Sequence, residues 1–330
     1  MREINEIESK FPILFDLLGD EYIEKLKLEQ GALSRKATIN PLFEILYMNN
    51  KFDLESLIRK ALDNKAIDKE RLKRFKNEKD NVNIQNFINE LHMLEPMYSY
   101  GNFLLEDNEN STPDFCATIN GKNIAFECVS VNEHRDCTKQ KNLDNVKINK
   151  DIKFFFKNNP NKNIFSAFNE YKPFGTTEIL KIIKKIRDVK SSKQTKSYPY
   201  KILMMSFKNM SFLCQPKECL PYTGNLYDGI HSGFIYPAFY GKRGDLIYET
   251  NSFEGEEHTI SLLDSDGKFS RDSDFNLCIF HFETQKNEEY KQYVFFENLK
   301  NPLPADLINQ LSDIFYPYKT YSVLKKLFHS

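Results

Sequence analysis

The 330-residue sequence predicts a mixed α/β (α+β) protein with a helical N-terminal region. Three observations support this fold class. Apolar residues recur at helical spacing through the first 78 residues. An Asn120-Gly121 pair lies between two segments of strand-like alternation, which is the strongest short-range signal for a β-hairpin. Further strand-like segments follow a later lysine-rich helical segment. We therefore divide the chain into a helical region, 1–78, and a sheet-containing core, 79–330.

The composition excludes several classes of protein. Phe and Tyr together account for 45 residues, too many for a disordered chain. No apolar run approaches the ~18 residues of a membrane span, and the first residues lack the pattern of a signal peptide. Six cysteines without a C-x-x-C pair do not suggest a disulfide framework. We expect a soluble cytoplasmic protein with reduced thiols and no membrane association.

The N-terminal region is expected to form amphipathic helices. Its apolar residues follow helical spacing in two groups: Ile4, Ile7, Phe11, Leu14 and Leu18, and then Phe52, Leu54, Leu57, Ile58 and Leu62. The highly charged run 68–80 is interpreted as a solvated helix or connector. Another amphipathic helix is predicted from Asn83 to Pro96, where the proline is expected to end it. We expect region 1–78 to serve dimerisation or binding of a partner protein.

The core is expected to combine short strands with two helices. The predicted strands are Asn102–Leu105, Asp114–Ile119, Asn123–Val131, Lys201–Phe207, Thr259–Leu263, Asn276–Phe282 and Tyr293–Phe296. The predicted helices are Thr176–Val189 and Ala305–Phe315. Asp266-Gly267 is interpreted as a hairpin turn that joins two of the later strands.

Charge is distributed unevenly, although the chain as a whole carries only −1. Residues 139–208 contain 17 basic and 5 acidic side chains, whereas residues 244–313 contain 5 basic and 15 acidic side chains. Phosphate backbones are the commonest partner of a basic face, because each neutralised phosphate releases counterions. The alternatives are that the two segments complement each other or that the lysines only aid solvation.

The candidate catalytic residues lie between positions 86 and 131. Glu127 stands inside the apolar segment 124–129, where an ionised carboxylate is costly unless it is paired or bound to a cation. The predicted hairpin brings Asp114 toward Glu127, and adjacent carboxylates repel unless a divalent cation lies between them. Mg²⁺ commonly binds one or two protein carboxylates and keeps several waters. The pair therefore predicts a metal site; a Glu127–lysine pair and a structural Pro-Asp turn are the alternatives.

This stretch resembles the PD-(D/E)XK nuclease superfamily, whose pattern is a helix Glu, then Pro-Asp at a strand, then Glu-x-Lys on the hairpin partner. Pro113-Asp114 matches the Pro-Asp, Glu127 matches the second acid, and Glu90 matches the helix acid. The resemblance implies a restriction-endonuclease-like mixed β-sheet core flanked by helices. It also implies that Asp114, Glu127 and the Cys128 carbonyl bind the metal, with Glu90 as a further or water-mediated ligand.

The sequence departs from the family pattern at the lysine, because Val129 stands two residues after Glu127. The resemblance implies that this lysine orients or deprotonates the attacking water, and that some family members carry it on a neighbouring helix. At 100° per residue, Lys185 lies nearer the apolar face of the predicted helix 176–189 than Lys184 does. We therefore predict Lys185 as the replacement.

Taken together, the residues and the resemblance predict a divalent-metal-dependent endonuclease whose catalytic residues are Asp114, Glu127 and Lys185. The expected cofactor is Mg²⁺ or Mn²⁺, and the expected substrate is DNA rather than RNA. Lysines of the basic segment are expected to contact phosphates: Lys139, Lys141, Lys181 and Lys184. Of these, Lys139 and Lys141 are also alternatives for the catalytic lysine.

The sequence also fits a second function. Loss of the motif lysine also fits a catalytically inactive subunit that binds nucleic acid or serves as a scaffold. A third alternative is a protein-interaction module with complementary charged faces. The resemblance implies a setting in bacterial restriction or phage defence, with a second copy of the chain or another protein of a defence system as partner.

Overall fold

The computed structural model describes residues 2–31, 40–48, 53–78, 80–100, 113–130, 175–191, 195–206, 219, 223–225, 229–231, 233–249, 260–283, 291–315 and 319–322. The predicted strand Asn102–Leu105 lies outside these residues. So does the first part of the basic segment, 139–174.

The N-terminal region is helical, as predicted. Its helices are α1 (Ile4–Lys10), α2 (Pro12–Leu18), α3 (Asp20–Gly31), α4 (Pro41–Tyr47), α5 (Leu54–Asp63), α6 (Lys69–Leu72) and α7 (Arg74–Asn77). Local chemistry sets several of their ends. The side chains of Asn40, Asp53 and Asp68 accept backbone N–H bonds at the starts of α4, α5 and α6. Gly19, at a φ of 78°, ends α2.

Two consecutive helices replace the single helix predicted from Asn83 to Pro96. Helix α8 (Asn81–Met93) is capped by the Asp80 side chain, and α9 (Glu95–Tyr98) follows after one residue. Pro96 lies in the first turn of α9, so its prediction as a helix end is wrong. A proline lacks only the N–H that has no acceptor in the first turn, and it is therefore compatible with a helix start.

A six-stranded mixed sheet forms the core, in the order β1-β2-β3-β8-β9-β10. Its strands are β1 (Phe115–Ile119), β2 (Lys122–Ser130), β3 (Tyr200–Ser206), β8 (Leu277–Glu283), β9 (Lys291–Glu297) and β10 (Lys319–Ser322). Strands β2, β3 and β8 run parallel, and β1 and β9 pair antiparallel with β2 and β8. The predicted hairpin is confirmed: Asn120 and Gly121 have φ angles of 49° and 71°, the positive values that a two-residue turn requires.

A smaller antiparallel sheet lies beside the main one and consists of β4 (Thr223–Asn225), β5 (Gly229–His231), β6 (Leu246–Glu249) and β7 (Ile260–Leu262). The prediction of a hairpin turn at Asp266-Gly267 is wrong, because β7 pairs with β6 whereas β8 pairs with β3 and β9. Gly267 instead packs against the backbone of helix α13 (Ile235–Tyr240). A Cβ atom there would lie 2.6 Å from the Phe239 carbonyl carbon.

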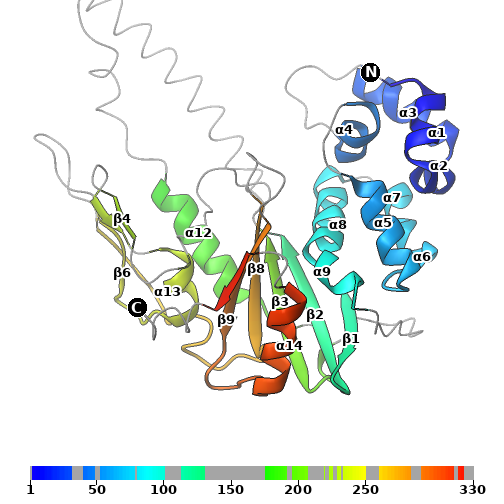
Figure 1. Ribbon diagram of the computed structural model, residues 1–330. Helices are drawn as coiled ribbons and strands as arrows, with labels where there is room; N and C mark the ends of the chain where they lie inside the picture. The colour runs from blue at the N-terminus through cyan, green and yellow to red at the C-terminus, as the bar shows by residue number, and fades with distance from the viewer. Residues whose placement is uncertain are drawn as a thin grey trace, which may run out of the picture.

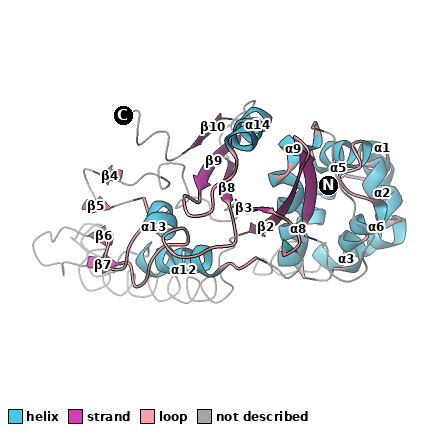
Figure 2. Ribbon diagram, turned by 90° about the horizontal axis from the view of Figure 1, so that it is seen from below, coloured by secondary structure: helices cyan, strands magenta, loops and turns pink. Residues whose placement is uncertain are grey.

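The two faces of the main sheet carry different helices (Figure 1). One face, here the α8 face, presents residues such as Phe126 and Ile279 to α8, the N-terminal helices and α14 (Ala305–Phe315). The opposite face, here the α12 face, presents residues such as Leu203 and Phe280 to α13 and α12 (Gly175–Asp188). Figure 2 shows the N-terminal helices beside α8, and α12 beside α13, at separate ends of the view.

The structure therefore has a mixed β-sheet flanked by helices, which agrees with the predicted α+β class. A single hydrophobic cluster runs from Ile7 in α1 through α8 to Phe315 in α14, so the N-terminal helices share a core with the sheet. Within the described residues, no helix combines the length and apolarity needed to cross a membrane. The division of the chain at residue 78 stays a prediction.

Candidate active site

Asp114 and Glu127 lie opposite each other at the open end of the hairpin. The register pairs Phe115 with Phe126, which places the preceding residue, Asp114, across from Glu127. The Cys128 N–H donates to Asp114 Oδ2 at 2.8 Å and so holds the aspartate against β2. Burial along β2 changes at this point, because residues 124–126 are buried whereas Glu127 is half-buried. Glu127 therefore stands at the border between core and solvent.

The carbonyl of Cys128 points toward the same edge of β2. In an antiparallel strand, the N–H and the carbonyl of one residue face the same neighbour, and the Cys128 N–H faces Asp114. The residue opposite Cys128 in this register is Pro113, which has no N–H to donate. Pro113 therefore cannot donate a ladder hydrogen bond to the Cys128 carbonyl, which lies beside the two carboxylates.

Glu90 approaches this pair from α8. Its side chain is 12% exposed, and its Oε2 lies 3.3 Å from Arg74 Nη1 and 3.6 Å from Arg71 Nη2. The pKa of Glu90 is raised to about 7, mainly by burial and then by the Asp114 charge, while the two arginines oppose the rise. Desolvation raises the pKa of the half-buried Cys128 most, and the charges of Asp114, Glu90 and Glu127 raise it further. All three acids therefore lie within electrostatic range of Cys128.

The donor set fits a magnesium ion held by two carboxylates. The described residues contain no group of three or more His, Cys, Asp or Glu side chains placed to bind one metal ion. Glu90 is instead engaged by Arg71 and Arg74. Asp114, Glu127 and the Cys128 carbonyl are hard oxygen donors at this edge, and Mg²⁺ commonly uses one or two carboxylates and completes its shell with water.

Lys185 reaches the same edge of the sheet from α12. Its Nζ donates to the Ser130 carbonyl at 3.0 Å, and burial lowers its pKa although part of the residue is exposed. Residues two apart in a strand point their carbonyls the same way, so this contact lies about 7 Å along β2 from the Cys128 carbonyl. Ser130 also connects to α8, because its Oγ accepts from Asn89 Nδ2 at 3.1 Å.

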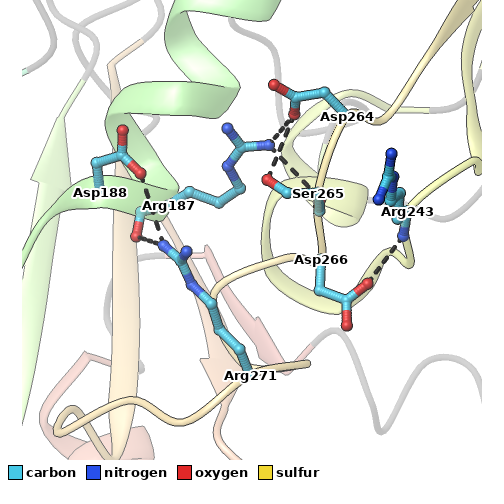
Figure 3. Close-up of polar contacts among 7 residues, drawn as sticks. All are labelled: Arg187, Asp188, Arg243, Asp264, Ser265, Asp266 and Arg271. Atoms are coloured by element: carbon cyan, nitrogen blue, oxygen red, sulfur yellow. Dashed lines mark hydrogen bonds and ion pairs between the residues drawn. The ribbon is translucent and has the colours of Figure 1, made fainter.

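A network of polar contacts fixes the end of α12 that carries Lys185 (Figure 3). The buried Arg187 guanidinium bonds Asp264, and Arg271 donates to the Arg187 carbonyl and lies 3.6 Å from Asp188. Cations near the last carbonyls of a helix are favourable. The Asp264–Asp266 stretch therefore anchors α12 and an adjacent loop, since Asp266 accepts from the Arg243 N–H at 2.9 Å.

The other predicted nucleic-acid contacts are only partly described. Lys139 and Lys141 lie outside the described residues. Lys181 lies in α12, and Lys184 of the same helix is exposed. Apolar spacing placed Lys185 nearer the buried face than Lys184, and the structure has Lys185 at the Ser130 carbonyl.

Arg71 and Arg74 contact this site, although the sequence pattern does not single them out. Both belong to the charged run interpreted as solvated or connecting, yet both contact the buried Glu90. The available signal was that arginine, unlike lysine, favours partly buried ion pairs, and arginine is scarce in this lysine-rich chain.

Comparisons with known proteins return no relatives. No protein-family model, no curated protein and no solved structure matches the chain significantly.

Proposed function

We propose that the protein is a divalent-metal-dependent nuclease that hydrolyses phosphodiester bonds, with DNA as the preferred substrate and Mg²⁺ or Mn²⁺ as cofactor. One observation carries the proposal: Asp114 faces Glu127 across an antiparallel register and is held there by the Cys128 N–H at 2.8 Å. Glu90 and Lys185 reach the same end of β2 from opposite faces of the sheet.

The residues at this edge would have different roles in the reaction. Asp114, Glu127 and the Cys128 carbonyl would hold the ion, which when bound lowers the pKa of a coordinated water and stabilises charge on a phosphoryl group. Lys185 would orient the attacking water or the phosphate. Its ammonium already lies at the β2 edge, and a change of side-chain rotamer would move it from the Ser130 carbonyl toward that of Cys128.

A second function rests on the Val129 position. With Val129 in place of the motif lysine, and with Lys185 bonded to a backbone carbonyl, the same fold could bind nucleic acid without cutting it. Such a protein would act as a binding or scaffold subunit, and its affinity for nucleic acid would not depend on Asp114.

Cleavage assays separate the two functions. Plasmid DNA, single-stranded DNA and RNA are incubated with wild type in Mg²⁺, Mn²⁺ or EDTA, beside Asp114→Asn, Glu127→Gln and Lys185→Gln. Asp272→Asn and Lys300→Gln are matched controls, because both residues are exposed and form an ion pair with each other rather than with β2. We expect metal-dependent cutting that is lost in both acid variants and kept in both controls. Salt-dependent binding without cutting of any polymer would favour the scaffold function.

A further inference from the structure

The N-terminal helices contact α8 through two arginine side chains. Arg71 and Arg74 come from α6 and α7 and place their guanidinium groups on one oxygen of Glu90. Arg71 is 24% exposed and Arg74 is 50% exposed, whereas Glu90 is 12% exposed. A guanidinium has five donors in a planar fork that matches a phosphate. Because both guanidinium groups share one Glu90 oxygen, some of their N–H donors are available toward solvent, next to the Asp114–Glu127 edge.

A small cavity continues from this arginine pair. It has a volume of about 160 Å³ and is lined by Arg74, Asn77, Glu78, Asn83, Ile84 and Phe87. The Arg74 guanidinium lies over the Phe87 ring at 4.5 Å from its centre, so Arg74 belongs both to the cavity and to the Glu90 contact. Pockets for drug-sized ligands measure roughly 300–1,000 Å³. The cavity therefore suits one small planar group.

The lining indicates the chemistry of that group. Ile84 and Phe87 form an apolar wall, Asn77 carries an amide that can donate and accept, and Asn83 Nδ2 donates to Glu78 Oε2 at 3.1 Å. A second phosphate would be repelled by Glu78. A nucleobase combines a flat apolar face with an edge of mixed donors and acceptors, and such bases stack on aromatic or guanidinium planes.

We propose that Arg71 and Arg74 bind a backbone phosphate next to the cleaved bond, and that the cavity between α7 and α8 receives the nucleobase attached to that phosphate. The subsite deepens the proposed nuclease function, because the strand it holds would be the substrate strand. It also assigns the N-terminal helices a direct role in substrate binding.

The test measures binding without cleavage. A fluorescein-labelled single-stranded 12-mer, and the same 12-mer without bases, are titrated in EDTA by fluorescence anisotropy at several salt concentrations. The variants are Arg71→Gln, Arg74→Gln and Asn83→Leu, which extends an exposed side chain at the cavity rim. The control is Lys73→Gln, which removes an exposed charge from the adjoining turn. Melting temperatures verify folding.

We expect each arginine variant to weaken binding of both oligonucleotides by about tenfold or more and to reduce the salt slope by about 0.7. Asn83→Leu should weaken only the oligonucleotide that carries bases, and Lys73→Gln should bind like wild type. Equal affinity in all variants, or absence of wild-type binding, would overturn the subsite. Because no metal is present, these results do not depend on cutting. A protein that binds as expected but never cleaves would refute only the nuclease function.

Discussion

The two faces of the sheet bury charge in different ways. On the α12 face, the Lys268 ammonium donates to the Val189 carbonyl just beyond α12, and Arg271 donates to the Arg187 carbonyl at the helix end. On the α8 face, Glu90 is buried beside another acid, Asp114, and is only partly compensated by its arginines.

This difference separates structural charge from candidate functional charge. A buried cation that donates to the last carbonyls of a helix satisfies their hydrogen-bonding capacity, so its burial has a structural explanation. Two acids placed together retain an electrostatic cost, and a divalent cation or a substrate would relieve it. The groups next to a buried charge, rather than its burial alone, therefore indicate that the candidate functional charges lie on the α8 side of β2.

A core substitution on the α12 face should cost the most stability and so shows whether that face is purely structural. Phe296 is fully buried and stacks on Phe239 with ring centres 4.3 Å apart. We expect Phe296→Ala to lower the free energy of unfolding by about 3–5 kcal/mol in urea titrations. The exposed Leu299→Ala should change it by about 0.5 kcal/mol or less. Cleavage per folded molecule should be retained, and a specific loss of cleavage would contradict a structural role.

At the open end of the hairpin we expect a substitution to lower the cleavage rate while hardly changing stability. Asp114→Asn should reduce the cleavage rate about a hundredfold or more, which corresponds to about 2.7 kcal/mol. It should hardly change stability, because the Asn carbonyl can still accept from the Cys128 N–H. The rate is measured at saturating Mg²⁺, and unfolding is measured in parallel. A large loss of stability with an unchanged rate per folded molecule would make Asp114 structural.

Glu90 should make stability fall as pH rises. Its pKa is raised to about 7 in the folded protein, so the folded state holds a proton that the unfolded state releases above its ordinary value of 4.5. Stability then declines between about pH 4.5 and 7, by up to about 3 kcal/mol. Urea unfolding of wild type and Glu90→Gln in EDTA should show this decline only in wild type. Parallel curves would contradict it.

Lys268 should have the opposite effect at higher pH. Burial lowers its pKa from 10.5 to about 8, so the unfolded state binds more protons between these values. Stability should rise from about pH 8 to 10.5, by up to about 3 kcal/mol. Compared with Lys268→Met, wild type should gain stability over that window. A constant difference between the two proteins would show that Lys268 keeps its proton in the folded state.

Local chemistry explains the parts of the fold that could be predicted. Helix α14 has the predicted bounds, Ala305–Phe315, because its apolar residues keep a regular helical period. The hairpin follows from Asn120-Gly121, since these residues tolerate positive φ. The predicted strand Lys201–Phe207 differs from β3 by one residue at each end. In each case, the prediction depends only on residues that are close together in the sequence.

Short-range patterns are therefore enough to predict most of the local elements and the approach of Asp114 to Glu127, because one short turn sets their register. The contacts of Arg71 and Arg74 with Glu90, and of Lys185 with Ser130, 55 residues away along the chain, arise only when the chain folds. The tertiary structure also assigns β7 and β8 to different sheets, so that Gly267 serves close packing against Phe239 rather than a hairpin. Such contacts depend on how whole faces of helices and strands pack, and short-range spacing carries no information about that packing.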